Sequence, residues 1–170
     1  MPTGEHSADE AENAIAFRNA MVYAALQATA GAVAPISIAL GGLVGVYLLD
    51  EGSRSLATAP VTGFNVGVAA AAIPAALLMR RFGRGSGFTL GALVGISGLL
   101  LAAYAVVVHS FLLFCLALML NGSANAFAQQ YRFAAADRGT PSFRAKAISY
   151  VLVGGVVAAI VGPQLTLFTR

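Results

Sequence analysis

Four long stretches of this chain contain no aspartate, glutamate, lysine or arginine, and they take up most of its length. They cover residues 19–49, 55–79, 85–131 and 147–169. The hydrocarbon core of a bilayer is about 30 Å thick and takes roughly 20 residues of helix to cross. Each stretch is long enough for this, so the pattern predicts an integral membrane protein.

The third stretch is too long for a single crossing, because it contains 47 residues (85–131). The polar pair His109-Ser110 divides it near its middle, and we expect a tight turn there between two antiparallel helices. The pattern then predicts a bundle of five membrane-spanning helices over residues 19–170, preceded by a polar cytoplasmic tail at residues 1–18. The helices are expected at approximately residues 20–49, 57–79, 87–108, 111–131 and 147–168.

A closed β-barrel is the other architecture that can span a bilayer. Barrel strands alternate apolar and polar residues over about ten positions, whereas the run at residues 68–79 shows no such alternation. The predicted fold class is therefore all-α, a polytopic helical membrane protein.

The composition agrees with lipid as the solvent. Of all residues, 58% are hydrophobic and 10% are charged, against about 25% charged in soluble domains. The net charge of +3 would favour nucleic acid as the partner of a soluble protein, but here the basic residues lie in short segments beside the apolar stretches. We therefore expect the lipid bilayer as a partner and no nucleic acid.

The basic residues are distributed unevenly between the two sides of the predicted bundle. With the N-terminus in the cytoplasm, eight of the ten lie on the cytoplasmic side, and Arg54 and Arg170 lie outside. Short loops rich in lysine and arginine resist translocation. We therefore expect a multi-pass protein of the bacterial inner membrane with a cytoplasmic N-terminus.

The fourth predicted helix carries the sharpest polar pattern. Asn121, Asn125 and Gln129 recur at a spacing of four and so share one helix face. Uncharged amides can hydrogen-bond a substrate in a wet cavity, and they can also join neighbouring helices inside a membrane. Gln27 in the first helix and Asn65 in the second are weaker candidates for the same substrate-binding role.

Several other chemistries lack the residues that they need. No charged side chain lies within a predicted span, so the chain itself offers no intramembrane carboxylate for proton coupling. Gly122-Ser123 could suggest an intramembrane serine protease, but His6 lies in the tail and His109 at an outer turn, and neither position suits a buried base. The sequence has no Cys/His metal cluster and no phosphate-binding loop. We expect no enzyme, no catalytic residue, no metal and no cofactor.

Three short motifs occur in an order that resembles the N-terminal half, helices 1–5, of a major facilitator superfamily (MFS) transporter. Residues 78–84, Leu-Met-Arg-Arg-Phe-Gly-Arg, resemble the hallmark loop Leu-x-Asp-Arg-x-Gly-Arg, with Arg80 in place of the family's aspartate. Asn121-Gly122 resembles a Gln-Gly motif, with Leu118 where that motif has an arginine. Gly162-Pro163 is similar to the Gly-Pro motif of many drug-exporting members.

The resemblance implies roles for these residues. Gly162 and Pro163 would bend the fifth helix. The first, second, fourth and fifth helices would line a central cavity, with the third helix packed outside. A gating loop on the cytoplasmic side would consist of Arg80, Arg81, Gly83 and Arg84.

Our first hypothesis is therefore transport of a small organic solute by alternating access, as part of an MFS-type secondary transporter, with both import and export open as directions. The family uses twelve helices in two bundles, so a five-helix chain would be a truncated part of such a protein. Its partner would be the missing C-terminal half or a second copy of the chain. The alternative is a non-transporting membrane protein whose amide face binds or scaffolds another membrane protein.

Overall fold

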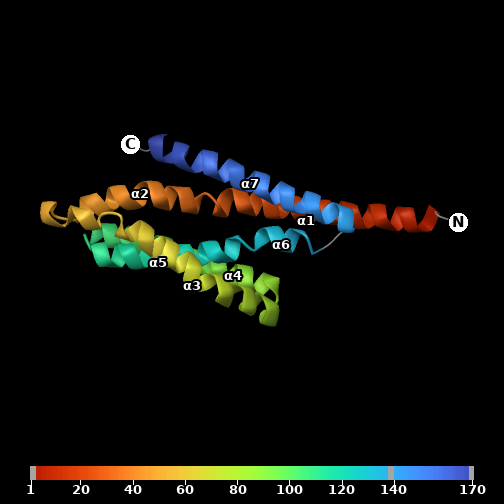
Figure 1. The fold of residues 1–170 in the computed structure, drawn as a ribbon, viewed down its shortest axis with the longest axis horizontal. Helices are drawn as coiled ribbons and strands as arrows, with labels where there is room; N and C mark the ends of the chain where they lie inside the picture. The colour runs from red at the N-terminus through yellow and green to blue at the C-terminus, as the bar shows by residue number, and fades with distance from the viewer. Residues whose placement is uncertain (1–2, 138–139, 169–170) are drawn as a thin grey trace.

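The computed structural model describes the backbone of residues 3–137 and 140–168 and the side chains of residues 12–137 and 140–164. These residues form helices joined by short turns (Figure 1). Five helical segments are long and apolar enough to cross a membrane, which confirms the predicted all-α membrane fold. In chain order the elements are α1 (Thr3–Ala30), α2 (Val33–Leu48), the 3-10 helix η1 (Glu51–Leu56), α3 (Ala59–Phe82), α4 (Arg84–Val107), α5 (Phe111–Ala128), α6 (Tyr131–Ala135) and α7 (Pro141–Phe168).

The helices form two groups (Figure 1). Helix α7 packs along α1 and α2, while α5 packs against both α3 and α4. The groups meet where α2 contacts α3 and α5, and the short α6 contacts α1 and α7. Toward the turn between α3 and α4 the two groups diverge, which leaves α5 and α6 as the connection between them at this end.

The first predicted span is two helices in the structure, because the chain turns at Gly31 and Ala32 between α1 and α2. Pro35 explains this interruption: it has no N–H to donate to the carbonyl of Gly31, and its ring crowds the preceding turn. The Ala32 N–H instead bonds the Thr29 carbonyl at 3.3 Å. The span therefore contains a break near its middle.

Helix α1 also begins earlier than the sequence suggested. Residues 3–18 of the predicted polar tail belong to this helix, and their place in the cytoplasm stays a prediction. Contact with α7 holds this end in place, because the Asn13 side-chain oxygen accepts hydrogen bonds from the Thr140 N–H at 3.2 Å and from the Thr140 hydroxyl at 3.1 Å.

Glycines allow the closest helix contacts. A Cβ at Gly67 of α3 would clash with the carbonyl oxygen of Met119, and one at Gly122 of α5 would clash with that of Phe64. Across the other group, Gly154 of α7 lies in the same way against the carbonyl of Ala24. Small residues thus let backbones approach in lipid, where packing and hydrogen bonds drive helix association.

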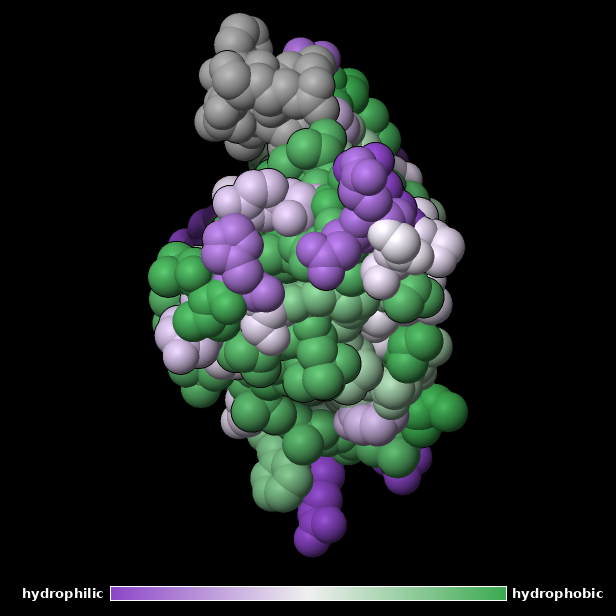
Figure 2. Space-filling view, turned by 90° about the vertical axis from the view of Figure 1, so that its left-hand side faces the viewer, coloured by the Kyte–Doolittle hydropathy of each residue, from purple (hydrophilic) through white to green (hydrophobic). Residues whose placement is uncertain are grey.

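The outer surface is largely hydrophobic. Leu100, Val107 and Leu112 are 67%, 77% and 71% exposed. Figure 2, which views the molecule from its α2 end, shows hydrophobic residues with scattered hydrophilic patches between them. Large exposed apolar surfaces of this kind are suited to lipid.

Candidate functional site

Helix α5 places the predicted amide face at the centre of the fold. Ser110 caps the start of the helix, and its hydroxyl oxygen accepts the Leu113 N–H at 3.5 Å, as expected of an N-cap serine. From this start the spacing of four brings Asn125 and Gln129 together, and the Gln129 amide nitrogen donates to the Asn125 side-chain oxygen at 3.2 Å.

Asn121 is the most enclosed member of this face. It is 2% exposed, and its side-chain oxygen has no hydrogen-bond partner among the described residues. Gly98 of α4 makes room for it, since a Cβ there would lie 2.9 Å from this oxygen. An unpaired buried carbonyl costs about 1–3 kcal/mol, so Asn121 presents an acceptor that a donor group would stabilise.

A cavity of about 190 Å³ lies beside Asn121 and Asn125. Its wall comes from the α1–α2 break, α4 and α5, and it includes Ala30, Gly91, Gly95, Phe127 and Tyr131. Helix α4, the third predicted span, lines one side of this cavity, where its glycines leave space next to α5. It packs mainly against α5 and α3, and its place outside the central cavity of the family stays a prediction.

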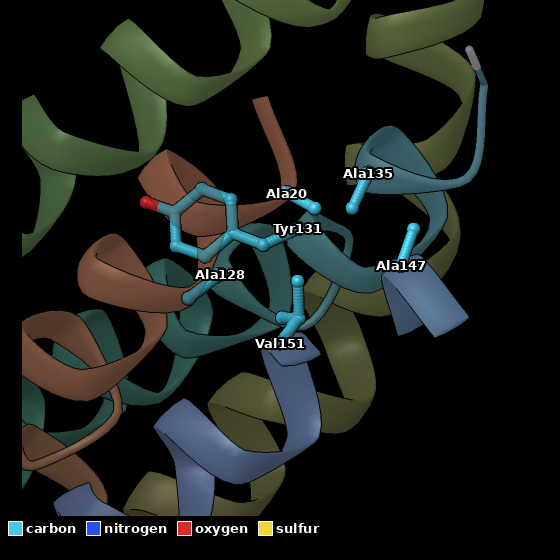
Figure 3. Close-up of a cluster of buried hydrophobic side chains, with 6 residues drawn as sticks. All are labelled: Ala20, Ala128, Tyr131, Ala135, Ala147 and Val151. Atoms are coloured by element: carbon cyan, nitrogen blue, oxygen red, sulfur yellow. The ribbon is translucent and has the colours of Figure 1, made fainter. Parts of the chain in front are cut away.

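An aromatic cluster adjoins this cavity. The Tyr23 and Tyr131 rings stack with centroids 6.1 Å apart, and Phe88 lies 4.8 Å from Tyr131 and 5.9 Å from Tyr23. Beside Tyr131 the helices pack through small residues, namely Ala20 of α1, Ala128 of α5, Ala135 of α6, and Ala147 and Val151 of α7 (Figure 3). The tight packing of these small residues therefore holds the Tyr131 ring in place.

A second, smaller cavity of about 60 Å³ holds the other amides. Gln27 and Gln129 line it together with Arg132, Val151, Leu152 and Gly155, between α1, α6 and α7. The predicted amides thus form two neighbouring sites, which the hydrogen bond between Asn125 and Gln129 joins.

Asn65 stands apart from both cavities. It is exposed on α3, and its side-chain nitrogen donates to the Val61 carbonyl of its own helix at 3.0 Å. The structure does not bring it to the other candidates.

The predicted gating loop is the turn between α3 and α4. Gly83 has φ 86° and ψ 158°, a region that is open to glycine alone. Arg84 pairs with Asp137 after α6, and Arg81 lies over the Phe82 ring at 5.4 Å. Arg80 lines a cavity with Arg84 and Gln130, so the residue that replaces the family's aspartate adds positive charge here.

The predicted bend in the last helix lies next to the α1–α2 break. Helix α7 runs without interruption through Pro163, and Gly162 is buried against Ala32 and Pro35. The two proline-containing segments therefore pack against each other.

Sequence reasoning missed Tyr23, Phe88 and Arg132 as members of the site. The aromatic residues come from different helices, so no spacing in the sequence groups them. Arg132 lies three residues after Gln129 and so continues the polar series of Asn121, Asn125 and Gln129. This spacing is the signal that could have identified it as a member of the site.

Comparison with known proteins shows that the chain is similar to part of several bacterial transporters. It is 47% identical over 155 residues, 91% of its length, to the riboflavin transporter RfnT of Brucella anthropi. It is 28% identical over 94% of its length to the uncharacterized MFS-type transporter YdeG of Bacillus subtilis, and 34% identical over 74% to YddS of the same organism. The chain spans 38%, 36% and 29% of these relatives' lengths. No family model and no solved structure matches it.

Proposed function

Because the chain belongs to the major facilitator superfamily, we propose that it forms part of a transporter that carries a small organic solute by alternating access, with flavins as the solute class. The observation that carries this proposal is the 47% identity with a riboflavin transporter over 91% of the chain.

The geometry of the first cavity supports a flavin. Riboflavin has a planar ring system whose edge carries N–H donors and carbonyl acceptors. The stacked rings of Tyr23 and Tyr131 offer a flat apolar face, which favours offset stacking. Asn121 and Asn125 both line this cavity, and their amides are suited to hydrogen-bond the polar edge of such a ring.

The size of the cavity supports a site shared with another bundle. Complete small-molecule sites measure about 300–1,000 Å³, and this cavity measures about 190 Å³. In MFS transporters the substrate lies between two six-helix bundles. We therefore propose that the facing wall comes from the other half of the transporter, or from a second copy of the chain.

The orientation is also a proposal. The turn between α3 and α4 and residues 132–146 carry seven of the ten basic residues, and the Arg84–Asp137 pair links these two segments. They therefore lie on one side of the membrane, and the positive-inside rule favours the cytoplasmic side of a bacterial inner membrane.

Uptake measurements test the function. The full-length natural protein that contains this chain is expressed in a bacterium that can neither make nor import riboflavin, and uptake of radiolabelled riboflavin is measured. We expect saturable uptake, weakened about fivefold or more in apparent affinity by Asn121→Ala, as one lost hydrogen bond predicts.

Asn65→Ala is the matched control, because Asn65 bonds only its own helix, and it should transport like the wild type. A correctly inserted protein that moves no riboflavin would exclude a flavin transporter. If it moved none of a panel of organic solutes, the membrane-scaffold alternative would be favoured.

A further inference from the structure

We infer that the smaller cavity, between α1, α6 and α7, is a binding site for an anionic oxygen group, a carboxylate or a phosphate, held by Arg132, Gln27 and Gln129. These three side chains line one cavity of about 60 Å³. The site stands whether or not the solute is a flavin, because it depends on these groups alone.

The guanidinium group of Arg132 is the main reason for this assignment. Its Nε is buried and has no hydrogen-bond partner among the described residues. The guanidinium carbon lies 5.0 Å from the centroid of the Phe133 ring. Stacking on a ring fixes a guanidinium plane and leaves its N–H donors free at the edge.

No described carboxylate neutralises Arg132. Four carboxylates have described side chains: Glu12, Asp50, Glu51 and Asp137. Asp137 is paired with Arg84, and Glu51 with Arg54. Glu12 is 15 residues before Gln27 on α1, about 22 Å along the helix, and Asp50 follows α2 at the far end of the molecule.

The remaining lining suits an anion of limited size. Both glutamine side chains carry N–H donors, and the guanidinium fork matches the two oxygens of a carboxylate or phosphate. A single water needs about 10–15 Å³ of such space, so 60 Å³ accommodates one anionic group and excludes a whole organic solute. The rest of a larger ligand would extend toward the open side, where Gln129 and Leu152 are exposed.

The test uses the full-length natural protein in nanodiscs of phosphatidylcholine, with inorganic phosphate as the probe. Phosphate is expected to raise the melting temperature in a saturable manner. Arg132→Gln should weaken phosphate binding at least about tenfold, because a charge-assisted contact is lost. Gly155→Ala should weaken phosphate binding because its methyl group takes up space in the cavity. The added Cβ would lie 3.7 Å from the Gln27 side chain, an ordinary contact distance, so it should not disturb the helix packing.

Arg144→Gln is the control, since it removes the same charge from an exposed position on the same helix as Gly155, and it should bind phosphate like the wild type. A second arm replaces phosphatidylcholine with phosphatidylglycerol and omits phosphate. If the stabilisation depends on Arg132 only in the phosphatidylglycerol arm, the site binds a lipid headgroup. If it depends on Arg132 only in the phosphate arm, the site binds a soluble anion.

The inference is overturned if neither arm shows stabilisation that depends on Arg132, or if Arg144→Gln lowers phosphate affinity as much as Arg132→Gln. Riboflavin uptake is measured separately, so loss of anion binding and loss of flavin transport are distinguishable outcomes.

Discussion

Arg84 and Asp137, 53 residues apart in the chain, form a two-point ion pair between the α3–α4 turn and the segment after α6. The Arg84 Nε lies 2.5 Å from Asp137 Oδ2, and its Nη2 lies 2.6 Å from Oδ1. The bidentate geometry fixes the relative position of two segments that belong to different parts of the fold. The pair thus connects the turn between α3 and α4, where the two helix groups diverge, to the segment that leads into α7.

A charge swap tests this connection. Asp137→Arg places two cations together and should lower the stability of the full-length protein by about 1 kcal/mol, and adding Arg84→Asp should restore most of it. Both side chains are more than one third exposed, so the effect stays small and should shrink in high salt. Thermal unfolding in detergent measures it. A double variant as unstable as the single one would show that the pair contributes nothing.

The backbone conformation of Gly83 predicts that this position tolerates no residue with a branched Cβ. Gly83→Val should cost about 1–3 kcal/mol, because φ 86° with ψ 158° is accessible essentially to glycine alone. Gly85→Val is the matched control two residues later, where a Cβ would meet no atom within 4 Å. Melting temperatures of the two variants decide the question, and equal values would remove the argument for this turn.

Close contact between α3 and α5 predicts a second sensitive glycine. Gly67→Ala forces the two backbones apart, since its Cβ would clash with the Met119 carbonyl, and overpacking of this kind costs about 1–3 kcal/mol. Gly42→Ala adds the same methyl group to open space on α2 and should leave the melting temperature unchanged or slightly raised. A similar loss in both variants would argue against the close crossing.

The sequence predicted the overall fold well, because long uncharged stretches without alternation of apolar and polar residues form helices in lipid. The number of spans followed from length alone. The break at Gly31 and Ala32 was not predicted, although Pro35 was visible, since a proline in a membrane helix can either bend it or interrupt it depending on what neighbouring helices supply. The contact between Asn13 of α1 and Thr140 joins residues far apart in the chain, and no local pattern reveals it.

The candidate site was predicted only in part. A spacing of four in one helix indicated the amide face and placed Asn121 and Asn125 together. Their separation from Gln27, and the joining of Gln27 with Arg132 in another cavity, depend on how α1, α6 and α7 cross. Tertiary contacts of this kind carry no signature in a single sequence.

Cysteine labelling tests the orientation. In a Cys115→Ala background, Ser55→Cys in η1 and Ser86→Cys in the first turn of α4 place exposed thiols at opposite ends of the bundle. With a cytoplasmic N-terminus, a membrane-impermeant thiol reagent applied to intact cells should label the cysteine at position 55 and spare the one at 86. The reverse pattern would contradict the positive-inside assignment.

The last prediction concerns water in the cavity beside Asn121. If this cavity is part of a hydrated pathway, Asn125→Cys in the Cys115→Ala background should react with a small hydrophilic thiol reagent, because only a solvated thiol ionises readily. Leu116→Cys is the control on the same helix. Leu116 is 44% exposed but faces the apolar surroundings of the bundle, so its thiol should stay protonated and unreactive. Riboflavin should slow the reaction at position 125, where the cavity lining would contact it. Equal rates at the two positions, or a rate at 125 that riboflavin leaves unchanged, would instead assign the amides to helix packing.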